Sequence, residues 1–210
     1  MPDATPAPRT GPIERLDTET RQAAIVQAAV RLCGQHSPGD ITTADFAREV
    51  GLTQGAIFKH FASKEAIWLA VMDWVAAHLL ERLRAAARTP STPLEALAAM
   101  FRTHVAFVAE HPGVPRLVFH DLQQAADSPV KRRLGALLAE YRALLLGQIE
   151  AAIERKDLTN PPPAPAAAML FIGIVQGLAM QSLLSPQALD LRAEGERLLP
   201  LFLRSIGAPT

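Results

Sequence analysis

The chain lacks the features that mark several classes of protein. Among its 210 residues there is one cysteine, Cys33, and 21 Lys and Arg balance 21 Asp and Glu, so the formal net charge is zero. A single cysteine cannot form an intramolecular disulfide or a cysteine-rich zinc site, which suits a reducing cytoplasm. Zero net charge gives no global attraction to a polyanion, so affinity for nucleic acid must come from locally placed charges.

Catalytic and cofactor motifs are also missing from the sequence. There is no Gly-rich phosphate loop, no GxSxG and no HExxH, and the pairs Glu110-His111 and His120-Asp121 are too sparse to specify an acid-base or metal site. The run MPDATPAPRTGP at the start has no apolar stretch and does not predict a secretory signal. We therefore predict a protein that is not an enzyme and that uses no cofactor or metal.

Strand-like alternation is absent, whereas helical spacing of apolar residues recurs along most of the chain. Residues 1–15 are rich in Pro, Ala and Thr and are predicted to form a disordered arm. After them, capping residues and Gly or Pro breaks divide the chain into about nine helices. Asp17 is a plausible cap for the first helix, and Ser185 with Pro186 is expected to open the last. The predicted fold class is all-α.

The stretch from Ile41 to Lys64 contains two short helical segments joined at Gly51. Thr42 and Asp45 have the spacing of a capping box at the start of the first segment, and glycine supplies the left-handed residue that ends it. Between Val50 and Lys64 there are two lysines, one histidine and no acid, so the second segment is locally basic. The pattern predicts a helix-turn-helix whose second helix enters the major groove of DNA.

The first residues of the second helix are expected to face base edges, and these are Thr53, Gln54, Gly55 and Ala56. Gln54 is the predicted base reader, because glutamine can pair bidentately with adenine. Gly55 and Ala56 are small enough to let the backbone approach. Groups predicted to contact phosphates are those of Thr42, Thr43, Lys59, His60 and Lys64.

Thr42, Ala47 and Gly51, followed by Phe58-Lys59-His60-Phe61 and Lys64, resemble the DNA-binding domain of TetR-family repressors. The family commonly has tyrosine where this chain has Phe58, so only van der Waals contact to the DNA backbone is expected there. The predicted organisation is a disordered arm (1–15), a helix-turn-helix domain (16–64) and a third part (65–210), which the resemblance implies is a regulatory domain. That last domain would hold an unidentified small-molecule effector and form a homodimer through its last two helices.

Polar and aromatic side chains on the later helices are candidates for the effector site, because ligand pockets are mostly apolar with a few convergent polar groups. The candidates are Trp74, His78, Phe101, His104, Phe107, His120, Gln123, Tyr141 and Gln176. The fourth helix is the expected coupling element, since it runs from the phosphate-facing Lys64 to Trp74 and His78.

Residues 166–184 form a stretch of 19 residues without a charge, long enough to span a membrane. Gln176 and Gln181 within it, and the absence of a basic cluster at its flanks, favour a buried helix instead. Its GxxxG step permits close approach of a second copy. The predicted dimer contacts are Gly173, Gly177, Met180, Leu198 and Phe202.

The sequence therefore predicts a cytoplasmic, sequence-specific DNA-binding regulator, released from a palindromic operator by a ligand. Its expected partners are double-stranded DNA, the effector and a second copy, with no membrane. Two alternatives remain open at this point: a regulator that senses redox state through Cys33, and a helical protein-interaction module without DNA affinity.

Overall fold

The structure is a computed structural model that describes residues 18–185 and 189–209. Within those residues every regular element is an α-helix, so the all-α prediction is confirmed. The nine helices of the described chain are α1 (Thr18–Gln35), α2 (Thr43–Glu49), α3 (Gln54–Phe58), α4 (Lys64–Arg88), α5 (Pro93–Glu110), α6 (Gly113–Leu122), α7 (Pro129–Glu154), α8 (Ala164–Leu184) and α9 (Leu191–Ser205). The predicted arm at 1–15 and the predicted cap Asp17 lie outside the described residues.

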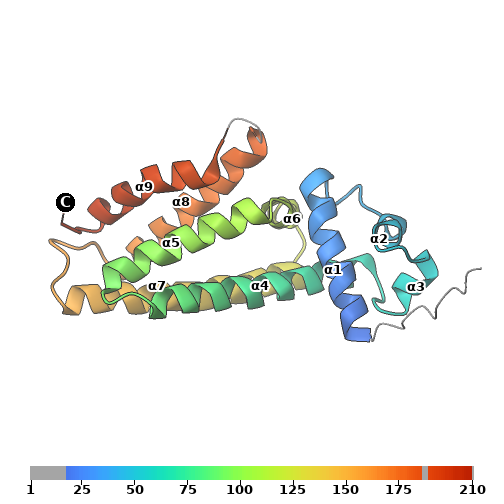
Figure 1. The fold of residues 1–210 in the computed structure, drawn as a ribbon, viewed down its shortest axis with the longest axis horizontal. Coiled ribbons are helices and arrows are strands. Elements are labelled where there is room, and N and C mark those ends of the chain that lie inside the picture. The colour runs from blue at the N-terminus through green and yellow to red at the C-terminus, as the bar shows by residue number, and fades with distance from the viewer. Residues whose placement is uncertain (1–17, 186–188, 210) are drawn as a thin grey trace, which may run out of the picture.

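The helices form an elongated molecule with α1, α2 and α3 at one end (Figure 1). The long helices α4 and α7 run side by side along the other part, and α5 packs on both. Helix α8 packs on α7, and α9 packs on α5 and α8. Short α6 lies between these two parts, where it packs against α1 as well as α7 and α8. Helix α6 therefore joins the larger helical unit to α1 together with α4, which also packs on α1.

The predicted capping box at the start of α2 is present. The Thr42 backbone amide donates to Asp45 Oδ2 at 2.8 Å, and the Asp45 amide donates to Thr42 Oγ1 at 3.3 Å. The Thr42 hydroxyl, which donates to Asp45 Oδ2 at 2.7 Å, and the Thr42 amide together hold the pKa of the Asp45 carboxyl below its ordinary value. Gly51, with φ of 66°, ends the α2 segment in the left-handed conformation, as expected.

The start of α9 corrects one prediction from the sequence. Ser185 is the C-cap of α8 and does not open the last helix, and Pro186 lies outside the described residues. Helix α9 begins at Leu191 because the Asp190 side chain accepts hydrogen bonds from the Arg192 and Ala193 amides, at 3.0 and 3.2 Å. An Asp N-cap satisfies helix-start amides at least as well as the Ser-Pro pair that was expected.

The first residue of α6 is pressed against the backbone of α1. A Cβ atom on Gly113 would stand 2.2 Å from the Val30 carbonyl oxygen and 2.8 Å from the Gly34 amide nitrogen. Both neighbours are helix backbone and cannot swing aside as a flexible side chain would. Only glycine therefore lets α6 lie this close to α1.

We predict that Gly113→Ala lowers the free energy of unfolding by about 1–3 kcal/mol, because the added methyl overpacks the α1–α6 contact. Urea denaturation measures the change. The matched control is Gly135→Ala in α7, where a Cβ meets nothing within 4 Å; that variant should gain up to about 1 kcal/mol from helix propensity. Equal stability of Gly113→Ala and the natural chain would contradict the close contact.

Candidate nucleic-acid interface and effector cavity

Buried apolar side chains hold the α2–α3 pair on the rest of the protein. Phe46, Ala47 and Ile57 are buried, and the Phe46 ring meets the Trp68 ring of α4 edge-on at 5.2 Å between centroids. The Leu52 amide donates to the Ala47 carbonyl at 2.8 Å and closes the turn between the two helices. A helix as short as α3 is not stable alone, so this packing is what fixes its direction.

The N-terminal tip of α3 is open to solvent. Thr53, Gln54 and Gly55 are exposed, and a Cβ on Gly55 would meet nothing within 4 Å. Gln54 Nε2, in the side chain, donates to Thr43 Oγ1 at 2.7 Å. The predicted base reader therefore lies beside a predicted phosphate contact, and Ala56, half-buried, follows them in the same turn.

Phe58 and Lys59 at the end of α3 are also exposed. The Phe58 side chain is 49% exposed, although a large apolar residue is usually covered. Lys59 holds no ion pair among the described residues. Both side chains are thus exposed at this end of the molecule.

Lys64 and His60 are turned partly inward. Lys64 Nζ donates to the Gly39 carbonyl at 3.0 Å and lies 6.0 Å from the centre of the Trp68 ring. Partial burial lowers the pKa of Lys64. The His60 carbonyl accepts from Gln22 Nε2 at 3.1 Å, and His60 Nδ1 is buried without a hydrogen-bond partner among the described atoms. These two residues brace the α1–α2 loop and α1 in addition to any contact with DNA.

Cys33 is a poor candidate for a redox sensor. The side chain is 1% exposed on the core side of α1, and burial raises the pKa of the thiol to about 12. Reactivity requires an accessible thiolate, which this environment disfavours. The structure therefore argues against the redox alternative and assigns Cys33 to the contact between α1 and α6, beside Gly113.

A cavity of about 210 Å³ lies between α4, α5, α6, α7 and α8. Four of the nine residues predicted to bind the effector line it, namely His104, Phe107, Tyr141 and Gln176. Apolar side chains make up most of the remaining wall, with Met72, Val75 and Leu79 contributed by α4.

The other five predicted effector residues do not line this cavity. Phe101 is core, with its ring 5.4 Å from that of Phe171. Trp74 and His78 lie on a neighbouring face of α4, their rings 4.6 Å apart, and His78 is exposed. The remaining pair are at the far end of α6: a Cβ on Gly39 would come within 3.4 Å of the His120 ring, and Gln123 is exposed.

The polar groups inside the cavity form a hydrogen-bonded pair. His104 Nδ1 lies 3.1 Å from the Tyr141 hydroxyl, and their rings meet edge-on with centroids 5.2 Å apart. Burial lowers the pKa of His104 from 6.5 to about 4, and it raises the pKa of Tyr141 well above 10.0. Both side chains are therefore neutral near pH 7.

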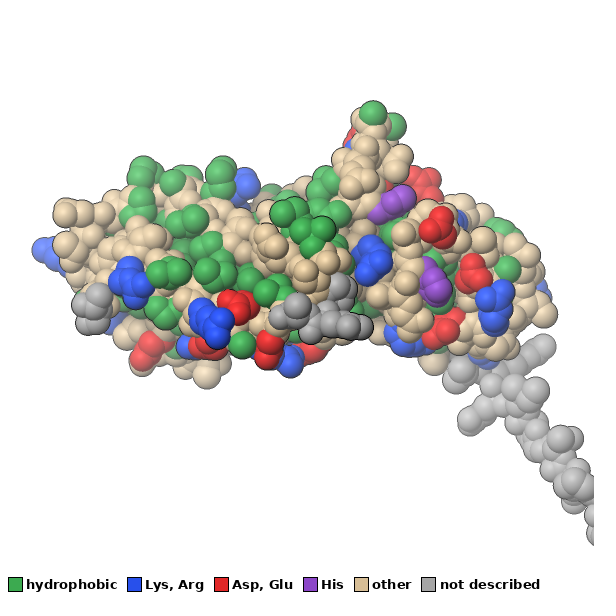
Figure 2. Space-filling view, turned by 90° about the horizontal axis from the view of Figure 1, so that it is seen from above, with side chains coloured by type: hydrophobic (Ala, Val, Ile, Leu, Met, Phe, Trp, Pro, Cys, Tyr) green, Lys and Arg blue, Asp and Glu red, His purple; other side chains and the backbone are tan. Residues whose placement is uncertain are grey.

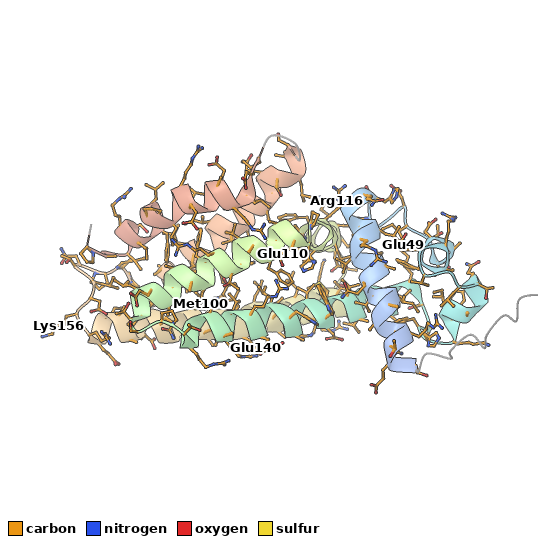
Figure 3. The ribbon with its side chains drawn as sticks, viewed as in Figure 1. Glu49, Met100, Glu110, Arg116, Glu140 and Lys156 are labelled. Atoms are coloured by element: carbon orange, nitrogen blue, oxygen red, sulfur yellow. The ribbon has the colours of Figure 1, made fainter. Side chains whose placement is uncertain are left out.

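Helix α6 provides a wall of the cavity that sequence reasoning missed. Its lining residues are Val114, Pro115, Val118, Phe119 and Leu122. Their spacing, with positions 114, 118 and 122 four residues apart, is the stripe of one helix face. This apolar stripe can be read in the sequence, but the prediction selected the polar residues His120 and Gln123, which lie off the stripe. The opposite face of α6 meets α1 near Arg116 (Figure 3).

An uncovered apolar face lies along α8 and α9. Exposed large apolar side chains there are Met169, Leu170, Met180, Leu184 and Leu201. Figure 2, seen from above the α8–α9 side, shows hydrophobic side chains gathered on this part of the molecule. A Cβ on Gly173 or on Gly177 would meet nothing within 4 Å, so both glycines border open space. Helix α8 is also long and apolar enough to cross a membrane by length and composition alone.

Two predicted dimer contacts on α9 differ in their exposure. Leu198 is half-buried and packs against the core. Phe202 is 1% exposed, and its ring packs 5.2 Å from the Phe171 ring. The prediction for Phe202 is therefore wrong in this chain, because its side chain is already covered by its own core.

Fold and site together define an all-helical, helix-turn-helix regulatory protein. Residues 25–71, which run from α1 into α4, match the model of a family described as bacterial regulatory proteins, tetR family. The chain is 26% identical to the HTH-type transcriptional repressor BepR of Brucella suis, over 91% of this chain and 93% of that protein. The match over residues 25–71 and the similarity to BepR support a TetR-family transcriptional regulator.

The chain is also similar to two further proteins. The chain is 23% identical to the nucleoid occlusion factor SlmA of a Marinomonas species, over 75% of this chain and 80% of that protein. The transcriptional regulator FadR of Bacillus subtilis, solved in complex with stearoyl-CoA, has the same fold with a TM-score of 0.76. That similarity covers 88% of this chain and 98% of that chain at 20% sequence identity.

We predict that acid weakens the fold partly through His104. The folded state keeps this side chain neutral down to about pH 4, whereas in the unfolded chain it takes up a proton near pH 6.5. Stability is therefore complete above pH 6.5 and is lost as the pH falls toward 4, by about 1.4 kcal/mol per unit. Urea denaturation between pH 7 and pH 5 should show a steeper loss for the natural chain than for His104→Leu. Parallel pH profiles would contradict the assignment.

Proposed function

We propose that the protein is a homodimeric, cytoplasmic repressor that leaves a palindromic operator when a small molecule binds it. In this proposal residues 16–64 dock on DNA, and residues 65–210 hold the effector and form the dimer. The observation that carries the proposal is the placement of α6, which lines the cavity with one face and packs on α1 with the other. One short helix therefore lines the cavity and also contacts α1 of the DNA-docking unit.

On the DNA side, Gln54 is proposed as the base reader. The Thr43 hydroxyl accepts a hydrogen bond from Gln54, and its own O–H can donate to a phosphate. Lys64 uses one of its three N–H donors on Gly39 and keeps the others for a phosphate. The remaining contacts are assigned to the same docking surface: Thr42, Thr53, Gly55, Ala56, Phe58, Lys59 and His60.

A single recognition helix of this size provides few contacts, so two copies are needed to read two half-sites. The face formed by Met169, Leu170, Met180, Leu184 and Leu201 is the proposed twofold interface. Gly173 and Gly177 border open space, as expected for glycines that admit a partner helix. Cover by a second copy is also the proposed reason for the membrane-like composition of α8.

Release by a ligand requires that the ligand favours one arrangement of α6 over another. Val118 and Phe119 on α6 face the cavity, Gly113 touches the α1 backbone, and His120 reaches the loop at Gly39. Lys64 at the start of α4 bonds the same loop. A shift of α6 would therefore act on the docking unit through α1 and this loop. We propose α6 as the coupling element together with α4.

The similarity to BepR favours a repressor over nucleoid occlusion, the function named for SlmA. The BepR match spans 91% of this chain and the SlmA match 75%. The BepR similarity therefore extends over more of the helices that contain the cavity and the apolar face. Both relatives are consistent with a protein that is not an enzyme.

The DNA contacts can be tested by mobility shift on DNA from upstream of the coding sequence, over a range of salt. Gln54→Ala should cost about 1–3 kcal/mol, mainly at the preferred site, whereas Lys64→Ala should weaken all sequences and reduce the salt slope by about one. Arg142→Ala, exposed on α7 away from the docking unit, is the control. Unchanged binding by both test variants would leave the DNA contacts without support.

The dimer face can be tested with Met180→Glu. The side chain is 48% exposed in one chain, so the change should leave the monomer folded. It would place two charges in the proposed twofold interface, and sedimentation should show monomers at concentrations where the natural chain is dimeric. Ala139→Glu, exposed on α7, is the control. A Met180→Glu dimer as tight as that of the natural chain would exclude this face.

A further inference from the structure

We propose that the cavity binds a small, uncharged and largely apolar molecule that carries one hydrogen-bonding group, held by the His104–Tyr141 pair. The name effector for this molecule rests on the proposed function, whereas its chemical class rests on the cavity alone. Neither the family match nor the relatives assign a ligand of this class to the chain.

The wall of the cavity contains polar side chains at only three lining positions. These are His104, Tyr141 and Gln176, and all other described lining residues are apolar. Among the residues that the structure describes, no Asp, Glu, Lys or Arg side chain lines the space. A charged ligand placed inside would lose water without gaining a counter-ion, which is strongly unfavourable.

Some charged side chains of the wall helices form ion pairs away from the cavity. Arg133 of α7 bonds Asp73 of α4 at 2.6 Å, and Arg84 of α4 bonds Glu140 of α7 at 2.9 Å. Glu140 lies along the outer side of these two helices in Figure 3. Arg116 lies on the α1 side of α6, away from the wall. These ion pairs join α4 to α7, and none of their side chains lines the cavity.

The His104–Tyr141 pair is suited to a single neutral group. One hydrogen bond joins Nδ1 to the hydroxyl, and either residue can be its donor. In one arrangement the imidazole Nε2–H remains as a free donor and the phenolic oxygen as an acceptor. In the other arrangement the phenolic O–H is free to donate and Nε2 accepts. A ligand hydroxyl, carbonyl or amide satisfies either arrangement.

Burial keeps the pair neutral, because it lowers the pKa of His104 to about 4 and raises that of Tyr141. Near pH 7 the imidazole therefore offers no positive charge to a carboxylate or phosphate. The phenol offers no negative charge to an amine. The pair selects for hydrogen bonding without charge at the pH of a cell.

The size and entrance of the cavity limit the ligand further. The volume of about 210 Å³ is below the range of roughly 300–1,000 Å³ of drug-sized pockets. Leu122, 51% exposed, and Gln176, also exposed, place the mouth between the end of α6 and α8. A short alkyl or single-ring molecule enters there with its polar group directed at the pair.

Calorimetric titration of the DNA-free protein at pH 7 tests the ligand class with three probes that share one alkyl chain: octanol, octanoate and octylammonium. Octanol should bind at least about tenfold more tightly than either charged probe, because only it enters without burying an unpaired charge. Equal or tighter binding of a charged probe overturns the proposal, and so does a failure of octanol to bind.

Two variants test the polar contact. Tyr141→Phe removes one hydroxyl and should weaken octanol binding by about two- to tenfold, the usual effect of one hydrogen bond. Trp74→Phe, outside the cavity, is the matched control and should leave octanol binding unchanged. Unaltered octanol affinity in Tyr141→Phe overturns the role of the pair. The probe series on the natural chain stands even where Tyr141→Phe is less stable.

The same titration separates this proposal from the proposed function. Octanol that binds as expected but leaves operator affinity unchanged in a mobility shift supports the ligand class and contradicts release by the ligand. Preferential binding of a charged probe that does release the operator overturns the ligand class and supports the repressor.

Discussion

The close approach of α6 to α1 at Gly113 is the constraint on which the arrangement of the molecule depends. With the hypothetical Cβ only 2.2 Å from the Val30 carbonyl, no other residue permits the two helix backbones to meet in this way. The contact places the first turn of α6 on the helix that supports the docking unit. It also sets the opposite face of α6, with Val118 and Phe119, against the cavity. Because packed protein interiors have low compressibility, a displacement of α6 would be transmitted to α1.

The distribution of charge explains how a neutral chain can contain both a DNA-docking end and a neutral cavity. No charged side chain among the described residues is buried, and the ion pairs, such as Arg102 with Glu196, join exposed groups. Exposed pairs contribute about 0–1 kcal/mol each, so they add little stability. Apolar packing therefore stabilises the fold. Lys59 is exposed and forms no ion pair among the described residues, so a neutral chain still has local positive charge at this end.

The parts of the fold that depend on neighbours in sequence were predictable. The capping box at Thr42, the left-handed Gly51 and the resulting helix boundaries follow from residues at most a few positions apart. The start of α9 was misassigned because Ser185 and Asp190 are both good caps, and local chemistry does not choose between them. Local rules therefore place a helix start correctly where the sequence offers only one capping residue.

The cavity depends on helix rotation in space, which the sequence determines only through the whole fold. Trp74 and His78 were chosen on α4, whereas the lining positions are Met72, Val75 and Leu79. Successive helix residues are about 100° apart, so a shift of one position moves a side chain from the cavity to an adjacent face. The same reasoning explains Phe202, whose rotation toward Phe171 places it in the core. Which face of each helix meets the others is set by long-range packing.

The magnitude of coupling needed for regulation is within reach of the few side chains on α6. Typical coupling free energies between two sites are about 1–3 kcal/mol. At about 25 cal/mol per Å² of apolar surface, this corresponds to roughly 40–120 Å² that a ligand covers in one arrangement of α6 and not in the other. Val118 and Phe119 can supply an area of that order without any charged contact. An apolar ligand therefore suffices energetically, provided that the α1 backbone resists at Gly113 and passes the displacement on to the docking unit.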